Sequence, residues 1–255
     1  LNCLRYRWAA SAINLFAPAS IGADLGRMAL VAVEHSEERL ERSVVIVLDR
    51  LVGMLSIAIV GLVAVLAAPT LAHRGIYLVV VTGFMGLLIA VTLLARSRLA
   101  AVVIDFLDAR WGRIGSAAGQ LLGAWAAATR RLADRPGVLA VALLLSIVLH
   151  SISIALVFVA AKAYGADVPM LTLAVVTAIS WLVTLIPIGF GGLGLREISF
   201  AVQLAPQGVT PEIATGIALF QFAVGLAMGI LGLPLLASMR RARRQERIDT
   251  GTGDS

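Results

Sequence analysis

Arginine, glutamate and glycine occur together in one short stretch of an otherwise apolar sequence. The stretch runs from Pro187 to Glu197, and its glycines are Gly189, Gly191, Gly192 and Gly194. Because proline removes a backbone donor and glycine weakens a helix, the chain should break here into two half-helices. A helix that starts after such a turn exposes free N–H groups and the positive end of its dipole, which attract an anion. Arg196 adds a planar fork suited to phosphate. The stretch therefore predicts an anion-binding site.

An earlier stretch has part of the same spacing. The pattern P-x3-G-x4-R is formed by Pro18, Gly22 and Arg27, and again by Pro187, Gly191 and Arg196. An apolar run follows each copy, and the two runs are expected to start on opposite sides of the membrane. Two like units of opposite orientation are typical of an inverted repeat, which places its ligand near the midplane. A three-residue match could arise by chance, and the opposite orientation favours the repeat.

The charged residues of both stretches also allow structural interpretations. Arg196 and Glu197 can form an ion pair that holds the turn, instead of a lipid site. Asp24 lies three residues before Arg27, so a local salt bridge competes with a headgroup contact. Arg50 is a further lipid-binding candidate, and its alternative is a side chain that snorkels to the inner membrane surface.

Composition predicts an all-α polytopic membrane protein with inverted repeats and broken re-entrant helices. The chain has 255 residues, of which 60% are hydrophobic and 14% charged. The runs long enough to span a bilayer are about 44–68, 76–95, 138–161 and 213–237. The net charge is +6, and it comes from arginines between the apolar runs, which favours anionic lipid headgroups and argues against nucleic acid. We expect one transmembrane domain at 1–239 and a basic to polar cytoplasmic tail at 240–255.

The arginine-rich segments predict the topology. Residues 96–136 and 240–255 should both be cytoplasmic, because arginine-rich loops stay inside. The last span can then run inward only if the region 172–204 enters from the outer face and returns without crossing. Its tip at 187–194 should lie within the bilayer, where broken backbone survives only if it is buried or lines a wet cavity.

The cytoplasmic segment at about 99–134 has the pattern of an amphipathic helix. Its apolar residues at spacings of three and four are Val103, Leu107, Trp111, Ile114, Ala118, Leu121 and Trp125. We expect this helix to lie along the inner membrane surface with its tryptophans at headgroup level. Its glycines at 115, 119 and 123 are spaced for close helix packing.

No catalytic chemistry is predicted from the sequence. The single lysine, Lys162, is not preceded by the glycines of a phosphate-binding loop, and no G-x-S-x-G occurs. Cys3 is the one cysteine, and the histidines at 35, 73 and 150 are far apart. We therefore expect no enzyme activity, no metal and no cofactor. The first residue is Leu1 rather than methionine, which indicates further residues before it.

The chain resembles the flippase-like membrane family related to the transmembrane region of lysylphosphatidylglycerol synthase. The matching features are Arg7-Trp8, Asn14 to Pro18, Gly22 with Asp24 and Arg27, Asp49-Arg50-Leu51, and Pro187 to Glu197. The resemblance covers nearly the whole chain and implies further N-terminal helices. It also implies a bacterial inner-membrane location and, in some relatives, a following synthase domain.

The resemblance implies movement of a lipid between leaflets, with an anionic, glycosylated or polyprenyl-linked lipid as the partner. A different interpretation fits the same residues, namely a membrane module that does not transport but binds a lipid or partner and regulates or anchors an enzyme. A partner enzyme or a second copy of the chain is also allowed. Leaflet exchange separates the two interpretations, because transport requires a site that opens to both faces.

Overall fold

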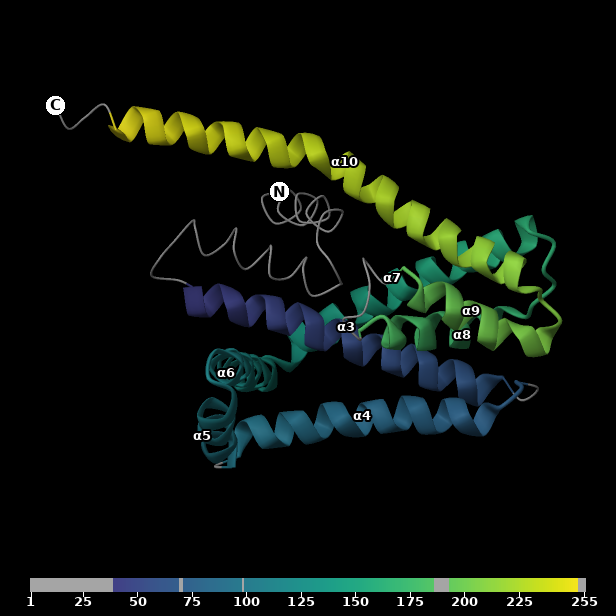
Figure 1. The fold of residues 1–255 in the computed structure, drawn as a ribbon, viewed down its shortest axis with the longest axis horizontal. Coiled ribbons are helices and arrows are strands. Elements are labelled where there is room, and N and C mark those ends of the chain that lie inside the picture. The colour runs from purple at the N-terminus through teal and green to yellow at the C-terminus, as the bar shows by residue number, and fades with distance from the viewer. Residues whose placement is uncertain (1–38, 69–70, 98, 186–192, 252–255) are drawn as a thin grey trace.

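The computed structural model describes residues 39–68, 71–97, 99–185 and 193–251, and every regular element in them is a helix (Figure 1). The long helices are α3 (Arg39–Ala67), α4 (Arg74–Arg96), α7 (Pro136–Ala163) and α10 (Pro211–Gly251). The shorter helices are α5 (Leu99–Trp111), α6 (Arg113–Ala133), α8 (Met170–Val183) and α9 (Leu195–Leu204), followed by a 3₁₀ turn at Ala205–Gln207. This confirms the predicted all-helical class.

Among the described residues, four helices are long and apolar enough to cross a membrane. The spans are Val47–Ala67, Arg74–Arg96, Pro136–Ala163 and Pro211–Pro234. They match the four predicted apolar runs to within a few residues. The protein is therefore an embedded, multi-pass helical protein. The segment from 240, expected as a separate tail, continues α10 as helix as far as Gly251.

The spanning helices lie roughly lengthwise in the bundle, and the short loops gather at one end of it (Figure 1). The end of α3, the start of α4 and the connections at 164–169 and 205–210 lie toward one end. Helices α5 and α6 and the C-terminal end of α10 lie toward the other end. The two arginine-rich segments are thus at the same end of the bundle, as the predicted topology requires. The side of the membrane that this end faces stays a prediction.

The segment predicted as one amphipathic helix is two helices in the structure. Gly112 separates α5 from α6 with a φ of 50°, a backbone angle that interrupts a right-handed helix. Helix α6 packs against α3, where Ala124 and Ala128 join a buried cluster with Val47 and Leu51. The prediction of a single helix was wrong because spacing alone does not distinguish a continuous stripe from two consecutive ones.

The indole of Trp125, which was predicted to lie at headgroup level, has a hydrogen-bond partner within the protein. Its side chain is half-buried, and its indole Nε1–H donates to Thr92 Oγ1 on α4 at 3.1 Å. Protein rather than the headgroup region therefore satisfies its polar end. Of the glycines in this segment, Gly119 packs closely, since a Cβ there would lie 2.9 Å from Ile104 Cγ2 on α5. Gly123 has open space around the same position.

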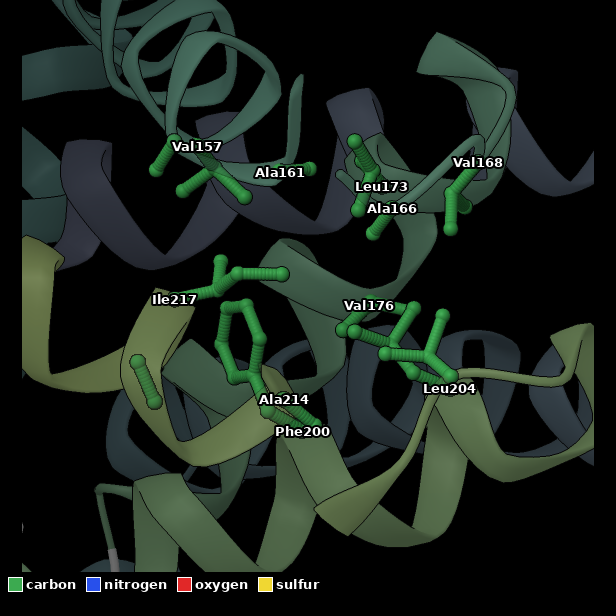
Figure 2. Close-up of a cluster of buried hydrophobic side chains, with 13 residues drawn as sticks. Val157, Ala161, Ala166, Val168, Leu173, Val176, Phe200, Leu204, Ala214 and Ile217 are labelled. Carbon is green, nitrogen blue, oxygen red and sulfur yellow. The ribbon is translucent and has the colours of Figure 1, made fainter. Parts of the chain in front are cut away.

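Two buried apolar clusters meet at α8. The first joins α8 to α7, α9 and α10, and it holds Leu173 and Val176 of α8 together with Phe200 and Ile217 (Figure 2). The second joins α8 to α3, α4 and α7, and its α8 members are Ala174, Val175, Ala178, Ile179 and Leu182. Because Leu173 and Val176 lie on one side of α8 and the second set on another, the helix forms the boundary between the two clusters.

Candidate functional site

The predicted interruption at 172–204 is present. Helix α8 ends at Val183 and α9 begins at Leu195, and the two helices have 14 and 10 residues. At 1.5 Å per residue they are about 21 and 15 Å long, too short for either to cross a hydrocarbon core alone. The two helices pack against each other. Helix α8 begins and helix α9 ends at the same end of the bundle, next to the loops (Figure 1). Pro187, Gly191 and Gly192 lie outside the described residues.

A ring contact fixes the depth of the interruption in the bundle. Trp181, two residues before the end of α8, meets His150 edge-on, with 5.9 Å between ring centroids and 75° between planes. His150 is close to the middle of the 28 residues of α7. The end of α8 therefore lies at the mid-depth of a helix long enough to span a membrane.

Polar side chains line the contact between α8 and α9. The Oγ atoms of Ser180 and Ser199 are 2.8 Å apart. Gln203 Nε2 donates to Ser199 Oγ at 2.7 Å, to the Ser199 backbone carbonyl at 3.0 Å and more distantly to Ser180 Oγ at 3.4 Å. Exposed fractions are 1% for Ser180 and 8% for both partners. We call this buried contact, together with Thr177 on the same face of α8, the polar seam.

Arg196 extends the polar seam toward the interruption. Residues three and four apart share a helix face, so Arg196, Ser199 and Gln203 lie on one side of α9. The opposite side is apolar and open, with Ile198 61% and Val202 67% exposed. Arg196 is half-buried, and no side chain in the described part of the chain accepts a hydrogen bond from it.

Glu197 acts on the backbone at the start of α9. Its Oε2 accepts a hydrogen bond from the Gly194 N–H, which is one of the four donors that a helix start leaves unpaired. Its Oε1 is buried and has no hydrogen-bond partner among the described residues. In the described part of the chain, the hydrogen bond of this carboxylate is therefore to the turn and not to Arg196. Glu197 thus holds the turn by capping the start of α9, whereas the structural interpretation expected it to do so through an ion pair with Arg196.

Gly194 has a backbone conformation that other residues avoid. Its φ is 87° and its ψ −59°. A Cβ at this position would meet nothing within 4 Å, so the need for glycine comes from the dihedral angles and not from lack of space.

A second polar contact lies at a similar depth between α7 and α10. Gln221 Nε2 donates to Ser153 Oγ at 3.2 Å, and Gln221 Oε1 is buried with no partner in the described residues. Gln221, Ser153 and Ser180 are each ten residues from the loop-side end of their helices, or about 15 Å at 1.5 Å per residue. Polar groups from four helices thus occur at one level of an apolar bundle.

The remaining predicted residues are not brought to this level by the described structure. Arg50 is half-buried on α3 and has an interaction partner of its own. It lies near the opposite end of the bundle, next to the cluster that α3 forms with α6. Pro18, Gly22, Asp24 and Arg27 lie outside the described residues, as does the first copy of the repeat.

Sequence reasoning missed the polar seam. Its signal is present as two polar patterns at helical spacing in apolar surroundings, T-x-x-S-x-x-x-T at 177–184 and R-x-x-S-x-x-x-Q at 196–203. Each pattern marks one face of a helix. Spacing alone does not show that the two faces meet.

Comparisons with known proteins agree with this architecture. Residues 1–232 match the model of the family described as the lysylphosphatidylglycerol synthase TM region. No curated protein and no solved structure matches the chain. The family is a membrane region tied to lipid metabolism or transport, and the match covers all four candidate spans except the last two residues of the fourth. The chain therefore belongs to the family of the lysylphosphatidylglycerol synthase transmembrane region.

Proposed function

We propose that this protein is a lipid translocase that moves an anionic or glycosylated lipid between the leaflets of the bacterial inner membrane. The observation that carries the proposal is the interrupted helix pair α8–α9, with Arg196 at the start of α9 and at mid-depth in the bundle. An arginine in the bilayer costs about 2.5 to 3.5 kcal/mol on insertion scales unless something pairs with it. A lipid phosphate is a partner that the membrane itself supplies.

The geometry of α9 suits a phosphate in two ways. Arg196 offers two parallel N–H donors that match two phosphate oxygens. The first turn of α9 adds the positive end of a helix dipole. One N–H at this helix start, that of Gly194, is already bonded to Glu197. In this proposal α8–α9 enters the membrane from the outer face and returns to it. The protein acts on membrane lipids and catalyses no reaction. It acts alone, with a second copy of the chain or with a partner enzyme.

Leaflet exchange in vesicles tests the proposal. The purified protein is placed in liposomes with an acyl-labelled fluorescent phosphatidylglycerol, and an impermeant quencher reports how much label reaches the outer leaflet over time. We expect exchange well above that of protein-free liposomes. Arg196→Gln should weaken lipid binding by about 1.5 to 3 kcal/mol, the range of a charged hydrogen bond, which is at least a tenfold loss of affinity. Lysine at this position should restore the loss only in part.

The matched control is Arg135→Gln, which removes an exposed arginine between α6 and α7 and should leave lipid binding unchanged. A structural role for Arg196 predicts a different result. Arg196→Gln would then lower the thermal midpoint, and Arg196→Gln combined with Glu197→Gln would recover it. That pattern, with lipid binding intact, would remove the headgroup site. Lipid binding without any exchange would instead favour the non-transporting module.

A further inference from the structure

The polar seam separates two apolar bodies. On one side, α9 shares the cluster of Phe200, Leu204 and Ile217 with α7 and α10 (Figure 2). On the other side, α8 shares the cluster of Val175, Ala178 and Leu182 with α3 and α4. Leu173 and Val176 are the α8 residues that belong to the first cluster. Below them toward the end of α8, the contact with α9 is made through Ser180 and its partners.

The seam has hydrogen-bonding capacity that the described residues leave unused. Thr177 Oγ1 and Gln203 Oε1 are buried and have no partner among them. The orientation of the Gln203 amide is fixed, because exchanging its nitrogen and oxygen would place Oε1 against the Ser199 carbonyl oxygen at 3.0 Å. One donor and one acceptor, each a helical turn from the Ser180–Ser199 contact, are therefore unpaired.

Unpaired buried polar atoms are costly in any apolar setting and need an explanation. An apolar pair of helices would pack without this cost. The unpaired polar atoms are explained if the seam has a second state in which they form hydrogen bonds with a polar ligand. Helix α9 has little to hold its outer side, where Ile198 and Val202 are exposed. Its first turn can therefore move away from the end of α8 at the level of Ser180 and Ser199, while the apolar cluster that Leu173 and Val176 of α8 share with α9 and α10 stays packed.

We infer that α8 and α9 part along the polar seam and that the seam then holds the hydroxyl groups of the lipid headgroup while Arg196 holds its phosphate. This inference rests on the proposed function and names its substrate class. The substrate is a phospholipid or glycolipid with hydroxyls next to a phosphate, as in a glycerol or sugar headgroup. Hydroxyls both donate and accept, which matches the free acceptor of Gln203 and the free donor of Thr177.

A reversible disulfide across the seam tests its opening. Ser180→Cys and Ser199→Cys are introduced together in a Cys3→Ser background. The two Oγ atoms are 2.8 Å apart, and a disulfide needs sulfurs about 2.05 Å apart, so a small shift closes the bond. Oxidation should reduce leaflet exchange of labelled phosphatidylglycerol at least tenfold, and reduction should restore it. Undiminished exchange in the oxidised protein overturns the inference, since α8 and α9 would then move as one unit.

The matched control links α8 to its other neighbour. A Cβ at Gly61 of α3 would lie 3.1 Å from Ala178 Cβ. A disulfide needs about 3.5 to 4.5 Å between Cβ atoms, so Gly61→Cys with Ala178→Cys joins α3 to α8 after a small separation of the two helices and leaves the seam free. Exchange should continue in that oxidised variant. An equal loss in both variants would mean that any restraint on α8 stops transport, which also overturns the specific role of the seam.

The headgroup part of the inference has its own test. Gln203→Met removes the amide at nearly constant length, and exchange of phosphatidylglycerol, which has headgroup hydroxyls, should fall at least fivefold more than exchange of phosphatidic acid, which has none. Equal losses for the two lipids overturn the hydroxyl assignment. This comparison does not need the cysteine pair to fold.

Failure of the proposed function gives a different result from failure of the inference. If the reduced protein moves no lipid, the proposal of translocation is wrong. Opening of the seam is then measured with the single variant Ser180→Cys in the Cys3→Ser background. N-ethylmaleimide should modify this buried position in the folded protein if the seam opens. Protection as complete as that of a permanently buried site, with reaction only after denaturation, shows that the seam stays closed.

Discussion

At the scale of single residues, Gly194 and Glu197 form one device that starts α9. The Gly194 N–H donates to Glu197 Oε2, and the Gly194 carbonyl accepts from the Ile198 N–H at 3.0 Å. A φ of 87° turns the chain so that both bonds form. Arg196 follows directly in the first turn of the helix, so the turn sets where its guanidinium lies. A glycine and a carboxylate therefore position the residue proposed to meet the lipid.

Gly194→Ala should destabilise the protein. The added methyl group has open space, but the dihedral angles are unfavourable for any residue with a Cβ. We expect the free energy of unfolding to fall by about 1 to 3 kcal/mol, the cost of a residue held in a sparsely populated region. Unfolding in detergent, followed by circular dichroism, measures this change.

The control for Gly194→Ala is Gly123→Ala on α6. Gly123 is helical and exposed, and a Cβ added there would have no neighbour within 4 Å, so alanine should stabilise the protein by about 0.5 to 1 kcal/mol. The two substitutions should thus change stability in opposite directions. If Gly194→Ala were neutral or stabilising as well, the turn could not depend on glycine.

At the scale of elements, α5 and α6 show how a glycine decides a helix contact. Gly112 ends one helix and starts the next, and the chain folds back so that α5 packs on α6. Gly119 lies in this contact, opposite Ile104. The pair is one unit across the end of the bundle, held to α4 by the Trp125–Thr92 hydrogen bond.

Gly119→Val should disrupt this contact. A Cβ at Gly119 would already lie 2.9 Å from a methyl group of Ile104. Isoleucine is branched at Cβ, so the χ1 angle of Ile104 is restricted and its methyl group has little freedom to move away. Overpacking of this kind costs about 1 to 3 kcal/mol. Thermal unfolding of the purified protein should show a lower midpoint.

A second substitution distinguishes overpacking from a general effect of valine in a helix. Ile104→Ala removes the methyl group that the new side chain meets, so Gly119→Val with Ile104→Ala should cost less than the sum of the two single changes. Gly123→Val, one turn along α6 with open space, should cost little. Additive losses, or an equal loss at Gly123, would show that the helices do not meet at Gly119.

At the scale of the whole molecule, the arrangement of helix ends predicts the topology. The loops 164–169 and 205–210 lie at one end of the bundle, and α5, α6 and the far end of α10 lie at the other (Figure 1). Since the arginines concentrate at the second end, that end should face the cytoplasm. The helix pair α8–α9 then enters and leaves at the outer face.

Single cysteines in a Cys3→Ser background test this orientation. Thr210→Cys, exposed before α10, should react with an impermeant maleimide only from the outer face, and Asp134→Cys, exposed after α6, only from the cytoplasmic face. Thr210 is a better probe than Gly208, whose φ of 74° makes a cysteine there strained. Labelling of Thr210→Cys only from inside would show that α8–α9 crosses the membrane.

The four spans and the interruption depend on residues that are neighbours along the chain, and both were predicted. Runs of apolar residues predicted the four spans, because a helix must be apolar along its own length to enter a bilayer. Proline and glycine between 187 and 194 predicted the interruption between α8 and α9, because they act on the local backbone. The placement of Arg196 at the start of a short helix follows from the same local rule.

Which helix faces meet depends on the packing of the bundle and was not predicted. Thr177 and Ser180 on α8 and Ser199 and Gln203 on α9 form one seam because packing sets the rotation and register of the two helices. The contact of His150 with Trp181 places the interruption at mid-depth, and no local pattern contains that distance. The division of 99–134 at Gly112 was also missed, since a helical stripe reads the same on one helix as on two that fold back on each other. Spacing along a chain records which residues share a face, whereas the neighbour of that face is chosen by the packing of the whole bundle.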